Sequence, residues 1–99
     1  MDDFFLAVSL YAKEGREDEL RSSLIAVVEP SRKDEGNLRY ELFADQSDPR
    51  RFIFLEHWAN PEARNKHHTQ TEHIRHFEKD GGASAVEKYE YVYTLNRIA

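Results

Sequence analysis

The chain has 99 residues, of which 39% are hydrophobic and 33% are charged, a length and composition typical of one globular domain spanning residues 1–99. Its net charge of −5 would repel nucleic-acid phosphates, and its lack of cysteine excludes disulfides, thiolate catalysis and cysteine-ligated metal sites. No apolar run approaches the ~20 residues of a membrane span, and the start Met1-Asp2-Asp3 is acidic, so we expect a cytoplasmic protein that contacts neither membrane nor nucleic acid.

The first part of the chain predicts a strand and then a helix. Residues 4–13 alternate so that both faces are largely apolar, which is typical of a central strand covered on both sides. Residues 16–29 change to helical spacing, with three acidic residues in the first turn. Pro30 should end or kink this helix, and Gly36 should stop any helical structure after one further turn.

The middle of the chain predicts two strands. Residues 37–46 have one apolar and one polar face, which indicates an edge strand. Residues 47–50, with the sequence Ser-Asp-Pro-Arg, are predicted to form a hairpin loop. Residues 51–58 are apolar on both faces and predict a second central strand.

The last part predicts a broken helix and an edge strand. Asn60 is a good N-cap for a helix over residues 61–79, which should break near Gln70 and stop at Gly81-Gly82. Residues 87–98 alternate and predict a strand with a row of tyrosines on one face: Tyr89, Tyr91 and Tyr93.

This order of elements predicts an α+β fold of ferredoxin-like βαββαβ type. Its four-stranded antiparallel sheet places the first and third strands in the centre, where the two-faced apolar pattern requires them. Two helices cover only one face of such a sheet. We therefore expect a homodimer in which a second copy covers the other face.

Three stretches resemble one known family. They are residues 35–42 (EGNLRYEL), residues 48–58 with the strand RFIFLEHW, and residues 68–73 (HTQTEH), where Glu72 replaces the proline usual in the family. The chain resembles the antibiotic biosynthesis monooxygenase domain, a quinol-monooxygenase-like member of the dimeric α+β barrel superfamily. The resemblance implies a cofactor-independent monooxygenase that oxidises a small quinol or phenol with dioxygen. It leaves open a non-oxidative isomerase of the autoinducer-processing type and a non-catalytic small-molecule-binding dimer.

The resemblance also suggests histidines of a site. His68 and His73 match the family segment, and an imidazole exchanges protons near neutral pH. We expect His68 to be the general base and His73 to contact substrate, with capping or packing as the alternative for His73. His67 and His76 are predicted to lie on the surface.

Glu56 lies on the apolar-rich face of its predicted strand, between Phe54 and Trp58. A carboxylate there needs a partner, so Glu56 is either a catalytic group in a pocket or the structural partner of an arginine or a helix N-terminus. Trp58 and Phe54 are expected to contact substrate. Tyr11 and Tyr40 are candidates for binding a planar ligand, although tyrosines on strands are more often packing residues.

No cofactor or metal is expected. The chain has only four glycines and no dinucleotide-binding or phosphate-binding motif. His73 and His76 are three residues apart, but no His-Glu-x-x-His sequence and no second carboxylate–histidine helix completes a metal site. No residue indicates haem ligation, although haem-degrading proteins share the fold. Reducing electrons must then come from the substrate, which favours an electron-rich quinol or phenol.

Overall fold

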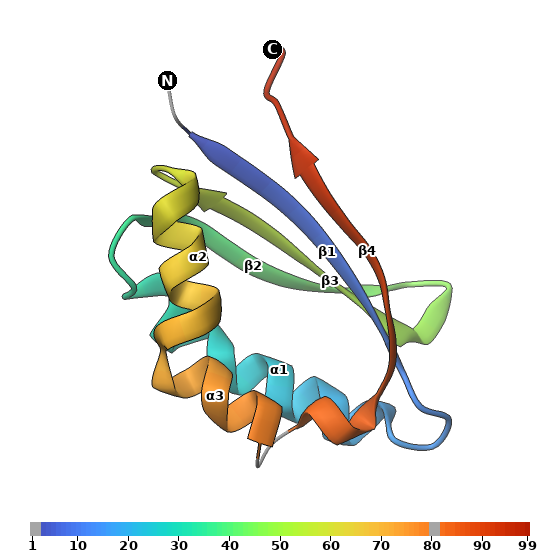
Figure 1. Cartoon of the computed structure of the whole chain (residues 1–99). Helices are drawn as coiled ribbons and strands as arrows, with labels where there is room; N and C mark the ends of the chain where they lie inside the picture. The colour runs from blue at the N-terminus through green and yellow to red at the C-terminus, as the bar shows by residue number, and fades with distance from the viewer. Residues whose placement is uncertain (1–2, 80–81) are drawn as a thin grey trace.

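The computed structural model describes residues 3–79 and 82–99, and it confirms the α+β class and the four-stranded antiparallel sheet (Figure 1). The elements, in chain order, are β1 (Phe4–Ala12), α1 (Glu17–Arg32), β2 (Asn37–Asp45), β3 (Asp48–Trp58), α2 (Pro61–Gln70), α3 (Glu72–Lys79), a 3-10 turn (Gly82–Ala85) and β4 (Val86–Leu95). The acidic start at Met1 and Asp2, and Gly81 of the predicted helix stop, lie outside the described residues.

The strand order is β2-β3-β1-β4, so β1 and β3 are central and β2 and β4 are edges, as predicted. In the register, Val8 pairs with Phe54 and Leu6 pairs with Glu56. The three helices lie on one face of the sheet, called here the covered face, and the opposite face is called the open face (Figure 1). Within the described residues, no helix is long and apolar enough to cross a membrane.

The core lies between the covered face and the helices. Alternate residues of β1 and β3 point toward α1, whose inner side chains recur three or four residues apart. Leu20 of α1 and Trp58 of β3 are both fully buried, at 0% exposure. Trp58 is the last residue of β3, and its burial packs this end of the strand against the helices.

The hairpin between β2 and β3 is tighter than predicted, so the loop expected at residues 47–50 is wrong. Asp45 pairs directly with Asp48, which leaves a two-residue turn. Each aspartate accepts a hydrogen bond from the backbone two residues later, at Ser47 and Arg50. These side-chain hydrogen bonds satisfy the backbone N–H groups of the turn and allow β3 to begin before Pro49.

The predicted row of tyrosines on β4 is also wrong in part, because the register shifts between Ser9 and Leu10 of β1. Tyr89 pairs with Leu10 and lies on the covered face, whereas Tyr91 and Tyr93 lie on the open face with their rings stacked 5.2 Å apart. An irregularity of this kind inserts one residue into a strand and so reverses the facing of those before it.

The connection from α1 to β2 is held close to α2. Pro30 does not end α1, which continues two residues beyond it to Arg32. Gly36 has a φ of +84°, and a Cβ atom there would lie 2.5 Å from the Cβ of Ala63 in α2. Only glycine fits this position, and the close approach brings Asp34, two residues earlier, beside the helices.

Candidate functional site

A small cavity of about 120 Å³ lies between the covered face and the pair α2–α3. Its wall is largely apolar, from β1, α1, β3 and α3. Its polar lining residues include Glu56, Arg64, His67, His68, Glu78 and Tyr89. An apolar cavity with a few convergent polar groups is the usual form of a small-molecule site.

Glu56 is buried in this wall, at 6% exposure. The indole N–H of Trp58 donates to Glu56 Oε1 over 2.9 Å, so the partner of the carboxylate is the tryptophan two residues later. Burial raises the pKa of Glu56, while the Trp58 hydrogen bond and the charge of Arg64 oppose the rise. The expected arginine or helix N-terminus is therefore not its hydrogen-bond partner. Phe54 also lines the cavity, whereas Trp58, expected to contact substrate, is not among its lining residues.

His68 lines the cavity from α2 and is exposed to solvent at the same time. Partial burial lowers its pKa, and the positive charge of Arg64 lowers it further. The neutral imidazole is thus favoured at neutral pH, as a proton acceptor requires. His68 and Glu56, from different elements, reach the same cavity.

Arg64 is a lining residue that the sequence interpretation missed. It lies one helical turn before His68, so the spacing alone placed it on that face of α2. Its Nε atom is buried without a hydrogen-bond partner, one of two such side-chain atoms among the described residues; the other is Glu17 Oε1. A buried guanidinium N–H without an acceptor is suited to binding an anionic oxygen.

His67 is not on the surface as predicted but is buried, at 3% exposure. Its Nδ1 atom lies 2.7 Å from Asp34 Oδ2, and its ring packs at 4.8 Å from the Trp58 ring and at 5.3 Å from the Tyr40 ring. Burial lowers the pKa of His67, and Asp34 acts in the opposite direction. The N-cap Asn60, which accepts from Ala63 N, fixes the start of α2 and hence this inward face.

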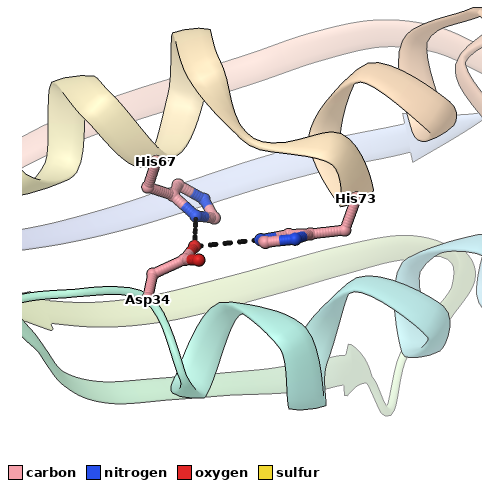
Figure 2. A group of neighbouring side chains, drawn as sticks. All are labelled: Asp34, His67 and His73. Carbon is pink, nitrogen blue, oxygen red and sulfur yellow. Dashed lines mark hydrogen bonds and ion pairs between the residues drawn. The ribbon is translucent and has the colours of Figure 1, made fainter.

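His73 does not line the cavity with His68. Its Nε2 atom lies 2.9 Å from the same Asp34 oxygen (Figure 2), and His73 also lines a second hollow between α1 and α3. Asp34, His67 and His73 are the described residues whose donor atoms are close enough together to hold a metal ion. His76 is exposed, as predicted.

The two tyrosines predicted to bind substrate lie on opposite faces of the sheet. Tyr40 lines the cavity and is buried at 3% exposure, and burial together with the charge of Glu56 raises its pKa. Tyr11 lies on the open face, where its hydroxyl donates to Asp48 and its ring lies beside Arg50. The structure therefore does not bring Tyr11 to the cavity, because alternate residues of β1 face opposite ways.

A larger groove of about 340 Å³ lies between α1 and the β2–β3 edge. Its polar lining consists of Arg21, Glu29 and Arg32, and Arg32 is paired with Glu29. The lining of this groove contains no histidine. The smaller cavity is therefore the better candidate for a chemical site.

Comparisons with known proteins place the chain in a family. A profile of the family described as antibiotic biosynthesis monooxygenase matches residues 3–80. The Bacillus subtilis protein "Putative monooxygenase YcnE" is 33% identical over 76 residues, covering 77% of this chain and 79% of that protein.

Solved structures agree in fold over nearly the whole length. PA3566 from Pseudomonas aeruginosa has a TM-score of 0.91 at 29% identity and covers 100% of this chain and 97% of its own. SO0527 from Shewanella oneidensis has a TM-score of 0.85 at 26% identity, covering 95% and 89%. The chain belongs to the antibiotic biosynthesis monooxygenase family.

Proposed function

We propose that this protein is a cofactor-independent monooxygenase that oxidises a small phenol or quinol with dioxygen in the cavity between the sheet and α2–α3. The observation that carries the proposal is the meeting of His68, Glu56 and Arg64 in one largely apolar cavity. The name of the Bacillus subtilis relative and the family description support a monooxygenase role.

The volume of the cavity limits the substrate. A cavity of about 150 Å³ in another protein binds benzene, so about 120 Å³ admits no more than one aromatic ring without movement of the walls. Phe54 and Tyr40 form part of the aromatic wall, with ring centroids 5.0 Å apart. We therefore favour a single-ring phenol or hydroquinone over a bicyclic quinol.

The proposed chemistry starts with a proton transfer to His68. A phenol titrates near 10 and a histidine near 6.5, so the transfer is uphill by about 5 kcal/mol without help. Because partial burial lowers the pKa of His68, the imidazole accepts the proton less readily and the phenolate needs stabilisation. The Arg64 guanidinium is the available donor, since Arg39 is paired with Glu41 and Arg51 with Glu90.

The phenolate then supplies all the electrons for the reaction. A phenol and dioxygen give a para-quinone and water, so one oxygen atom enters the ring and the other is reduced to water. The ring carbon is oxidised and no external reductant is consumed. Glu56, whose Oε1 already accepts from Trp58, offers its carboxylate to orient a second hydroxyl of a quinol.

The proposal is tested by oxygen uptake and quinone absorbance, with chelated protein and several single-ring phenols and hydroquinones. We expect His68→Ala and Arg64→Met each to lower kcat by about a hundredfold with little change in KM. Arg75→Met is the matched control, because Arg75 is an arginine of α3 paired with Glu72 outside the cavity. Unchanged rates in both cavity variants would refute the assigned roles.

Wild-type protein without activity on any of these compounds would refute the oxygenase proposal. If phenols still bound in the cavity, the isomerase or the non-catalytic binding dimer would become the better explanation. Binding is measured separately by the thermal shift that a ligand produces.

We also propose that the protein is a homodimer in which the open faces of two sheets pack together. Four large apolar side chains of this face are between 45% and 52% exposed: Phe43, Tyr91, Tyr93 and Leu95. An obligate interface of this kind buries more than about 2,000 Å². A sedimentation experiment that finds a stable monomer at micromolar concentration would contradict it.

A further inference from the structure

Three metal-ligating side chains from separate segments converge beside the proposed cavity. Asp34 comes from the α1–β2 connection, His67 from the last turn of α2 and His73 from the start of α3. Figure 2 shows both imidazoles directed at one carboxylate oxygen, over 2.7 Å from His67 Nδ1 and 2.9 Å from His73 Nε2. The three donor atoms all lie within 4.8 Å of one another.

The cluster is sheltered from solvent and held in place. The exposed fractions of the side chains are 3% for His67, 16% for His73 and 15% for Asp34. The Asp34 backbone is bonded on both sides, from its N–H to Ser31 O and from Asn37 N–H to its carbonyl.

The break between α2 and α3 fixes the two histidines relative to each other. The Thr71 hydroxyl donates to the His67 carbonyl, and the Arg75 N–H donates to the Thr71 carbonyl. The two imidazoles are therefore positioned by the backbone on each side of the break, and little ordering remains for a bound ion to impose.

We propose that Asp34, His67 and His73 bind a divalent transition-metal ion of the zinc class, with water completing the coordination. Two imidazole nitrogens and one carboxylate are a ligand set that Zn²⁺ accepts together with a water molecule. Ligands at zinc distances of about 2.0–2.1 Å lie about 3.3 Å apart. Binding would therefore widen the two contacts to Asp34 from 2.7 and 2.9 Å, and would bring atoms now up to 4.8 Å apart closer together. The ion takes the place of the two hydrogen bonds to Asp34.

In a neutral imidazole, metal binding would change which ring nitrogen carries the hydrogen. A carboxylate only accepts hydrogen bonds, so without metal His67 Nδ1 and His73 Nε2 carry the hydrogens. Coordination moves each hydrogen to the other ring nitrogen. His67 also lines the cavity, so the metal site and the proposed substrate site share this residue.

The test uses chelated, untagged full-length protein titrated with Co²⁺, which reports a tetrahedral site through its visible absorption, followed by competition with Zn²⁺. We expect one Co²⁺ per chain, displaced by Zn²⁺. Asp34→Asn and His73→Gln should each weaken binding at least about tenfold. Circular dichroism establishes that each variant is folded, and His73→Gln alone decides the question if Asp34→Asn does not fold.

The matched control is His57→Gln. His57 Nε2 lies 3.1 Å from Asp3 Oδ2 on the open face, so this variant removes a single histidine–aspartate pair without a second histidine. It should bind Co²⁺ like the wild type. No tetrahedral Co²⁺ spectrum in the wild type, or unchanged binding in both cluster variants, would overturn the proposed metal site. The three side chains would then serve only as a hydrogen-bonded structural contact. Because no step measures oxidation, failure here is distinguishable from failure of the oxygenase proposal.

Discussion

The two faces of the sheet hold their charged groups in opposite ways. On the covered face, Glu56 is a single buried carboxylate with one neutral donor, and burial raises its pKa. On the open face, Arg51 contacts Asp45, Asp48 and Glu90 in one network of part-exposed groups. Charge partners there hold the pKa of Glu90 below its usual range.

We propose that this difference separates a group placed for chemistry from groups placed for structure. A carboxylate buried with a single neutral donor costs stability and persists where a site uses it. A network with compensating charges stabilises the fold and is fully formed without a ligand. Substitutions on the two faces should therefore change the free energy of unfolding in different ways, which can be measured before any substrate is known.

Trp58→Phe should have the largest effect on stability. It removes the N–H that donates to Glu56 and leaves a buried carboxylate without a hydrogen bond, so we expect a loss of about 3 kcal/mol in the free energy of unfolding. Urea unfolding measures it. The double variant Trp58→Phe with Glu56→Leu is the control, because replacing both partners by apolar groups should recover part of the loss. A single variant as stable as the wild type would show that the hydrogen bond is dispensable.

Glu56→Gln should have an intermediate effect that depends on pH. The raised pKa means that the folded wild type binds a proton more tightly than the unfolded chain. Its stability therefore falls as pH rises from the ordinary pKa near 4.3 through the higher pKa of the folded state. Glutamine does not titrate, and each pKa unit corresponds to about 1.4 kcal/mol. The variant should therefore gain stability relative to the wild type between pH 4 and pH 7 in unfolding experiments. A difference that stays constant over this range would contradict the raised pKa.

Arg51→Gln should have the smallest effect, with the opposite dependence on pH. The lowered pKa of Glu90 contributes stability that is complete above the ordinary carboxyl value near 4.3 and is lost as pH falls through the folded value. The variant should be less stable at neutral pH, with the difference shrinking below about pH 4. Arg39→Gln removes the exposed pair with Glu41, and it should change neither the stability at neutral pH nor its dependence on pH. Parallel acid-unfolding curves for wild type and Arg51→Gln would refute this account.

Much of the fold follows from local patterns in the sequence. The two-faced apolar segments became β1 and β3 in the centre of the sheet, and Asn60 became the N-cap of α2. The errors fall where side chains alter the backbone locally. Aspartates tightened the β2–β3 turn, and the register shift opposite Ser9 turned Tyr89 to the covered face.

The candidate site was less predictable, because it depends on contacts between distant residues. Placing Glu56 and His68 required only the facing of a strand and a family segment, whereas Asp34 is 33 positions before His67 and no local pattern joins them. Burial of His67 follows from that contact. Helical spacing could have placed Arg64 on the same face of α2 as His68, one turn later. It could not have shown that the Arg64 Nε atom lacks a partner.

The location of the substrate is tested most directly by the indole N–H resonance of Trp58, the only tryptophan in the chain. This N–H donates to Glu56 in the cavity wall. We predict that a single-ring phenol, titrated without oxygen, shifts the resonance saturably, and that Arg64→Met weakens the response. An unmoved indole resonance, with shifts at Ser9 and Tyr91 on the open face instead, would contradict the assignment of the substrate to the cavity.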